Sequence, residues 1–252
     1  MNIKEFLDEH VEKINTEAFI DDDPVRFPRR YNDLRDIEIV AFTVANIAWG
    51  KRSMILRDAE RMLAKMGTSP FDFVMNEGYK TLGTANVHRT FFEHNLAYML
   101  RGFKALYADY KSIDECFASL PEDKRNAWTL VETLNGYAMQ ANAQQTDIRC
   151  YSRNAVKSAL KRVNLALRWL VRTDGIVDIG VWKSLKPCDL YIPLDVHVGN
   201  TARALGLLTR SSNDRRAVEE LTAKLREFNP SDPIIYDFAL FGVGVTQQSF
   251  KI

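Results

Sequence analysis

The chain has 252 residues, of which 46% are hydrophobic and 27% charged, a mixture typical of a globular protein with a sizeable core. Its 34 Lys and Arg side chains nearly balance its 33 Asp and Glu side chains, which excludes recognition of nucleic acid or membrane through a global excess of charge. Three widely spaced cysteines form no CxxC pair and indicate no disulfide framework. The chain has no run of about 18 apolar residues and no signal-peptide core at its start, so we expect a cytoplasmic protein without a membrane span.

Apolar residues recur at helical spacing along most of the chain and predict an all-α fold of roughly ten helices. The segments with this spacing are residues 3–14, 36–50, 51–67, 88–110, 112–120, 127–144, 154–172, 196–206, 214–228 and 234–245. The segment 36–50 is unusually apolar and predicts a buried helix, although its β-branched Ile37, Ile39 and Val40 also fit a strand. Residues 173–191 are rich in Gly and Pro and predict a long irregular excursion.

The segment 154–172 carries the strongest helical pattern in the chain. Its apolar positions fall on one face: Val156, Leu160, Val163, Leu167 and Leu170. A narrow basic stripe lies almost opposite: Lys157, Lys161, Arg168 and Arg172. Such a stripe is either the solvated side of an amphipathic helix or a surface for phosphates. Because no acid stands at i+4 to pair with any of these cations, the pattern favours an anionic partner.

Asp195 stands among apolar residues, immediately before the predicted helix 196–206, in "IPLDVHVGNTARALGL". Asp is a preferred N-cap residue, and its charge suits the positive end of a helix dipole. The same position would also hold a carboxylate rigidly toward a ligand, so both interpretations stay open. His197 and the other three histidines lack further ligands at metal-binding spacing, and no metal site is assigned.

Several segments, taken in order, resemble the helix-hairpin-helix DNA glycosylase superfamily. The segments are "DIEIVAFTVANIAWGKRSMILRDAERMLAKMGTSPFDF", "KSALKRVNLALRW", "PLDVHVGNTARALGLL" and "AVEELTAKLREFNPSDPIIYDFALFGVGV". The resemblance places Asp195 on that family's essential aspartate and Lys161 on its catalytic lysine. Over nearly its full length the chain also resembles a bacterial family known as domain of unknown function 2400, through "SALKRVNLALRWLVR", "IPLDVHV" and "YDFALFGVGV".

The chain departs from the glycosylase pattern in three places. The family hairpin reads "LPGVGxKTA", whereas "SRNAVKSALKR" has no glycine that would let backbone N–H groups approach a phosphate. Lys161 and Asp195 are 34 positions apart, longer than is typical, so residues 173–191 would be an insertion. The chain ends "GVTQQSFKI" without the cysteines that hold an iron–sulfur cluster in some members, so no cofactor is implied.

The resemblance implies two helical lobes with a cleft between them, one of residues 36–150 and one of residues 1–35 plus 151–252. It implies base excision from damaged double-stranded DNA, with or without lyase activity, in which Lys161 forms a Schiff base and Asp195 stabilises charge on the sugar. The expected DNA contacts are Lys157, Arg162, Arg168 and Arg172. Asn46 and Trp49 are candidates for the rim of the base pocket or for filling the gap. The alternatives are a catalytically inactive nucleic-acid-binding protein on the same scaffold and an all-α protein with an unrelated partner.

Overall fold

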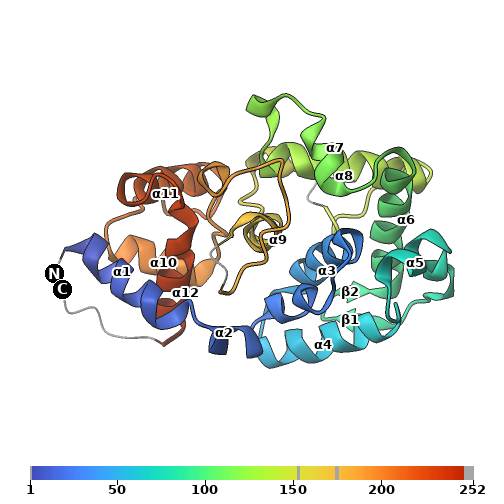
Figure 1. Ribbon diagram of the computed structural model, residues 1–252, viewed down its shortest axis with the longest axis horizontal. Coiled ribbons are helices and arrows are strands. Elements are labelled where there is room, and N and C mark those ends of the chain that lie inside the picture. The colour runs from blue at the N-terminus through green and yellow to red at the C-terminus, as the bar shows by residue number, and fades with distance from the viewer. Residues whose placement is uncertain (1, 152–153, 174–175, 247–252) are drawn as a thin grey trace.

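The computed structural model describes residues 2–151, 154–173 and 176–246, and most of these residues are helical (Figure 1). The α-helices are α1 (Ile3–Ile14), α2 (Glu17–Asp21), α3 (Leu34–Ile47), α4 (Arg52–Ala64), α5 (Pro70–Met75), α6 (Glu93–Asp109), α7 (Ile113–Ala118), α8 (Ala127–Ala141), α9 (Lys161–Val171), α10 (Val196–Ala204), α11 (Arg215–Phe228) and α12 (Tyr236–Thr246). A small antiparallel hairpin joins β1 (Asn86–His88) to β2 (Phe91–Phe92). The all-α prediction is therefore confirmed at the level of fold class.

Two buried helices, α3 and α9, lie side by side in the middle of the molecule (Figure 1). Every residue of α3 from Asp36 to Ile47 is buried, and so is every residue of α9 from Asn164 to Val171. A helix that is covered on all sides can be apolar all round, which accounts for the unusual composition of residues 36–47. The strand reading of this segment is wrong.

Two groups of helices lie on opposite sides of this central pair (Figure 1). Helices α1, α10, α11 and α12 lie at one end, and α4, α5, α6 and the hairpin lie at the other (Figure 1). At the first end α12 packs against both α1 and α10, so the N-terminal helix joins the last part of the chain. The exact division into residues 36–150 and the rest stays a prediction.

The predicted helix 154–172 begins later than its pattern indicates. A single 3₁₀ turn, η5 (Ala155–Lys157), comes first, and α9 starts at Lys161 after Leu160 adopts a left-handed conformation with φ of 47°. Tertiary contacts explain the break: the Trp128 indole donates to the Ser158 carbonyl at 2.9 Å, and Ser158 forms a bridge with Asp214. These contacts use backbone groups of Ser158, among them its carbonyl oxygen, that a continuous helix would need for its own hydrogen bonds.

Residues 88–110 also differ from prediction, because their first five residues form the turn and strand ends of the hairpin rather than a helix. Arg89 takes a positive φ of 49° at the turn. The described residues of the predicted excursion 173–191, namely 173 and 176–191, form no helix or strand apart from the 3₁₀ turn η6 (Pro187–Asp189), as predicted. Parts of three predicted features lie outside the described residues: Ser152 and Arg153 of the hairpin-like stretch, Asp174 and Gly175 of the insertion, and residues 247–252 of the cysteine-free end.

Candidate functional site

Lys161 and Asp195, far apart in the sequence, meet in one cleft. Lys161 is the first residue of α9, Asp195 is the N-cap of α10, and their Nζ and Oδ2 atoms lie 3.9 Å apart. Both side chains line a cleft with a volume of about 1070 Å³ and are partly open to it, with 27% and 21% of their side-chain surfaces exposed. An amine and a carboxylate are therefore brought together where a ligand has access.

The two oxygens of Asp195 have different surroundings. Oδ1 accepts a hydrogen bond of 2.9 Å from the backbone N–H of Val198, which is the N-cap interaction predicted from the sequence. Oδ2 faces the Lys161 amine. The Asn213 side-chain amide donates to the backbone carbonyl oxygen of Asp195 at 2.9 Å and so helps to hold Asp195 in place. One carboxylate thus caps the helix with one oxygen and presents the other to the cleft.

The Lys161 amine donates to the carbonyl oxygen of Ala48, at the end of α3, over 2.9 Å. Burial lowers the pKa of Lys161 below its usual value, while the nearby carboxylates of Asp195, Asp237 and Asp23 act in the opposite direction. Among neighbouring cations Arg168 lowers the pKa as well, but by less than burial does. Lys157, one of the expected DNA contacts, lies exposed on η5 and does not line the cleft.

Asp237 of α12 is a third acid of this site, and sequence reasoning missed it. It is buried, it lines the same cleft, and its Oδ2 accepts from Arg168 Nη1 at 2.5 Å. Burial raises the pKa of Asp237 to about 6. The negative charge of Asp195 also raises this pKa, whereas the Arg168 guanidinium lowers it. An acid inside the otherwise apolar "YDFALFG" was the available signal, because such a residue is expected to have a buried partner.

The prediction of an exposed basic stripe is wrong for Arg168 and Arg172, whose side chains are buried. Arg168 Nε donates to Asp178 at 3.2 Å, and Arg172 is bonded to Asp178 and to Asp232, the latter at 2.8 Å. The ion pairs join α9 to the irregular excursion and to the segment that leads into α12. Buried charges require such partners, and these partners occupy the groups that we had assigned to DNA.

Arg162 and Asn46 form one polar unit beside the cleft. Arg162 Nη1 donates to the backbone oxygen of Asn46 at 3.0 Å, to its Oδ1 at 2.8 Å and to the Arg149 carbonyl at 3.3 Å. Asn46 is buried and is not among the residues that line the cleft, so the structure does not place its side chain at the rim. Arg162 does line the cleft. Its guanidinium is held by neutral oxygens, which leaves its positive charge effective toward a ligand.

Trp49 lines the cleft, as we expected of a rim residue. Its ring lies edge-on to the buried His88 ring, and the Arg89 guanidinium stands 4.5 Å from its centroid. His88 also donates from Nε2 to the Trp49 carbonyl oxygen at 2.8 Å. The following Gly50 has a φ of +99°, and a Cβ there would meet Arg89 Nη1 at 2.7 Å, so glycine lets the cation approach the indole.

Charges are distributed unevenly over the cleft. Its acids are buried or half-buried on the floor, namely Asp23, Asp195 and Asp237. Its exposed charged residues are all cations, namely Lys51, Arg89 and Arg149. These three residues, called the cationic rim below, lie on loops and turns, where no periodicity in the sequence could have grouped them. A cleft with a cationic rim raises the local concentration of anionic ligands although the whole chain is almost neutral.

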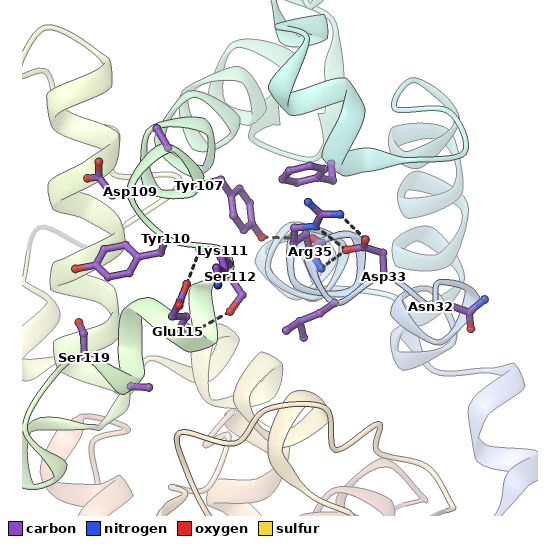
Figure 2. Close-up of a pocket in the computed structure, with 14 residues that line it drawn as sticks. Asn32, Asp33, Arg35, Tyr107, Asp109, Tyr110, Lys111, Ser112, Glu115 and Ser119 are labelled. Carbon is purple, nitrogen blue, oxygen red and sulfur yellow. Dashed lines mark hydrogen bonds and ion pairs between the residues drawn. The ribbon is translucent and has the colours of Figure 1, made fainter.

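A second hollow, with a volume of about 1320 Å³, lies between the start of α3, the end of α6 and α7 (Figure 2). Figure 2 shows the Arg35 guanidinium paired with the Asp33 carboxylate. The Glu115 carboxylate accepts from the Lys111 backbone N–H, and the Glu115 backbone N–H donates to the Ser112 hydroxyl. Arg35 also lies 3.9 Å from the centroid of the Phe71 ring. The Lys161–Asp195 pair does not belong to this hollow, and we place the candidate site in the first cleft.

The described residues contain no group of three or more His, Cys, Asp or Glu side chains arranged to hold a metal ion. Within the same ranges no helix combines the length and the apolar character that a membrane crossing requires.

Comparison with known families gives one match. The model of the family described as "Protein of unknown function (DUF2400)" matches residues 23–246, so the chain belongs to that family. No curated protein and no solved structure matches the chain significantly.

Proposed function

We propose that this protein is a base-excision DNA glycosylase that also cleaves abasic sites through a lysine Schiff base. The observation that carries the proposal is the convergence of the Lys161 amine and the Asp195 carboxylate, 3.9 Å apart, in a cleft with a cationic rim. The likeness of these two positions to the aspartate and lysine of the helix-hairpin-helix glycosylases supports the same assignment.

The chemistry requires one group that stabilises charge and one that attacks. As the bond between base and sugar breaks, the base leaves with the bonding electrons and positive charge develops on the sugar. The free Oδ2 of Asp195 stabilises that charge more in the transition state than in the ground state. Lys161, once it has lost a proton, attacks C1′ of the sugar through its nitrogen lone pair. The nitrogen then loses a second proton. The C1′–O4′ bond breaks as O4′ takes up a proton, and the nitrogen lone pair forms the C1′=N bond of the protonated Schiff base.

The surroundings of Lys161 favour the attacking form of the amine. Burial disfavours the ammonium and lowers the pKa of Lys161, so a larger fraction is neutral at a given pH than for a lysine in water. Lys161 is the first residue of α9 and directly follows Leu160, whose backbone is left-handed. The helix therefore fixes the backbone position of Lys161.

The lining of the cleft suits a nucleotide that has been swung out of a duplex. Aromatic and apolar side chains from separate elements line it, among them Trp49, Phe91, Leu165 and Phe241. An extruded base needs apolar and stacking surfaces, and its phosphates need cations such as those of the rim. The volume of about 1070 Å³ lies slightly above the usual range for small-molecule pockets, roughly 300–1,000 Å³.

Trapping with borohydride tests the proposal directly. The protein is mixed with duplexes that contain an abasic site or oxidised bases, borohydride is added, and the covalent complex is measured by gel and intact mass. We expect a complex with the wild type and none with Lys161→Gln. Lys111→Gln removes an exposed lysine that does not line the cleft and is expected to trap like the wild type. Absence of a complex across all of these substrates would refute the lyase chemistry.

Two observations favour a second candidate, a nucleic-acid-binding protein without catalysis. The Lys161 amine already donates to the Ala48 carbonyl, and the hairpin-like stretch has no glycine. This candidate predicts salt-dependent DNA binding that Asp195→Asn leaves unchanged, together with no change in the DNA. Release of a free base by the wild type, measured by chromatography, would exclude it.

A further inference from the structure

Asn213, in the connection between α10 and α11, contacts the backbone of Asp195 rather than its carboxylate. Its side-chain amide donates to the Asp195 carbonyl oxygen at 2.9 Å. The same oxygen accepts the first hydrogen bond of α10, from the Gly199 N–H at 2.9 Å, so both of its lone pairs are used. Asn213 is exposed and lines the cleft. An exposed side chain at the candidate site thus fixes the peptide group of Asp195.

The Asn213 amide is itself held by the far end of α10. Its Oδ1 accepts from Arg203 Nη2 at 2.5 Å, and Arg203 Nε donates to the Arg210 carbonyl oxygen at 2.8 Å. A backbone carbonyl can only accept and a guanidinium can only donate, so one orientation of the amide satisfies both partners. The direction of the Asn213 side chain is therefore fixed at both of its polar atoms.

Gly199 makes room for this amide. A Cβ at position 199 would lie 2.7 Å from Asn213 Oδ1 and 3.0 Å from Asn213 Nδ2, closer than ordinary van der Waals contact. Position 199 lies inside α10, where alanine would favour the helix more than glycine does. The glycine is thus unfavourable for the helix alone, and the side chain that it admits accounts for it.

The two residues after Asn213 contact the other half of the catalytic pair. Asp214 forms a bridge with Ser158, three positions before Lys161. The Arg215 guanidinium lies 4.2 Å from the centroid of the Trp128 ring, whose indole donates to the Ser158 carbonyl oxygen at 2.9 Å. One short segment, residues 213–215, therefore holds the backbone of the acid and the backbone that leads into α9.

We propose that Asn213 is a positioning residue of the Lys161–Asp195 pair. It fixes the Asp195 backbone, and with it the direction of Oδ2, relative to the segment that leads to Lys161. A shift of about 1 Å in a catalytic group can lower a rate by about 10²-fold, so one hydrogen bond to a backbone carbonyl can matter for the rate while it contributes little to stability. The effect on the rate rests on the proposed function, whereas the placement of Asp195 does not.

Two substitutions remove the contact in opposite ways. Asn213→Ala deletes the amide, and Gly199→Ala keeps it but fills its space with a methyl group. We expect both to slow borohydride trapping at saturating DNA by at least about tenfold and to leave duplex affinity within about twofold. Gly199→Ala should not lower the midpoint of thermal unfolding, because alanine favours a helix more than glycine does. A purely structural role predicts no slower reaction in a variant as stable as the wild type.

Asn229→Ala is the matched control, at the other end of α11 and outside the cleft. Asn229 Oδ1 accepts from Ser231 Oγ at 2.9 Å and from the Asp232 N–H at 3.1 Å. Its loss should lower the midpoint of thermal unfolding and leave trapping at the wild-type rate. Trapping by Asn213→Ala at the wild-type rate would overturn the proposal. Equal losses of duplex affinity and rate would also overturn it, because Asn213 would then be a DNA contact.

Amide hydrogen exchange, followed by NMR without DNA, tests the placement of Asp195 separately. The Val198 N–H donates to Asp195 Oδ1 and reports whether the acid is in place. Relative to the slowest amides of each variant, we expect Asn213→Ala to speed this exchange about fivefold, the factor for one ordinary hydrogen bond, and Asn229→Ala to leave it unchanged. Faster exchange in Asn213→Ala, with no trapping by the wild type, would support the positioning role and refute the lyase. Trapping by the wild type, with both exchange and trapping unchanged in Asn213→Ala, would support the lyase and refute the positioning role.

Discussion

Lys161 faces one oxygen of Asp195, and the backbone of α10 takes the other. The amine lies 3.9 Å from Oδ2, whereas Oδ1 accepts from the Val198 N–H at 2.9 Å. The structural role and the proposed catalytic role of this residue therefore use different atoms. A substitution that keeps a cap and removes the charge can separate them.

Asp195→Asn is that substitution. Asn caps helices about as well as Asp, so the free energy of unfolding should change by less than about 0.5 kcal/mol, measured by urea denaturation. Borohydride trapping should slow by a factor on the order of 10² to 10³, because a group aimed at developing charge is lost. Asp195→Ala should in addition destabilise the protein by about 1 kcal/mol. Equal trapping by Asp195→Asn and the wild type would refute the catalytic role of Asp195, and only its structural role as N-cap of α10 would remain.

The sequence allowed prediction of the two residues of this pair for different reasons. Asp195 precedes an apolar-periodic segment and is followed by an ordinary helix, so its N-cap position could be read directly. Lys161 came from a resemblance that fixed its place in the chain. The start of α9 could not be predicted, because Trp128 and Asp214, both distant in sequence, interrupt a pattern that is helical throughout.

The other residues of the site show why periodicity has limits. Arg168 lies on the polar side of a helical wheel, yet two acids from other segments, Asp178 and Asp237, bury it. Periodicity reports how polar a face is, but not whether another element covers it. Ile148 and Arg89 lie in turns, where side-chain direction has no period at all, and three-dimensional contacts alone bring them to the cleft.

Asp237→Asn should alter the pH dependence of trapping. The neutral amine attacks, so the rate should rise with pH until the pKa of Lys161 is passed. The Asp237 carboxylate raises the pKa of Lys161, and its removal should move this rise to lower pH. Burial raises the pKa of Asp237 itself to about 6. Below about pH 6 the wild-type acid is already protonated, so the two rate profiles should converge there and differ above it.

Asp232→Asn is the matched control for this profile. Asp232 belongs to the same ion-pair network through Arg172 but does not line the cleft. Its variant should keep the wild-type pH profile even if the protein loses some stability, which thermal unfolding records separately. A shift of the profile to higher pH with Asp237→Asn would have the wrong sign and would contradict the assignment.

Arg168→Met should destabilise the fold strongly. The substitution leaves Asp237 without its arginine and Asp178 with Arg172 as its remaining arginine partner. Loss of one partner from a buried ion pair costs about 3–5 kcal/mol, measured as the free energy of unfolding in denaturant. Lys157→Met changes an exposed cation nearby and should stay within about 0.5 kcal/mol of the wild type. A loss below 1 kcal/mol for Arg168→Met would return Arg168 to the candidates for a DNA contact.

Arg149→Ala should reduce the salt dependence of DNA binding. Each phosphate that a protein cation neutralises releases counterions, so a plot of log affinity against log salt falls with a slope of about −0.9 per contact. Loss of Arg149 from the cationic rim should make that slope shallower by about 0.9 on an undamaged duplex, measured by fluorescence anisotropy. Lys111→Ala removes an exposed cation from the second hollow and should leave the slope unchanged. A smaller slope for Lys111→Ala, with no change for Arg149→Ala, would place the DNA on the second hollow instead of the cleft that holds Lys161 and Asp195.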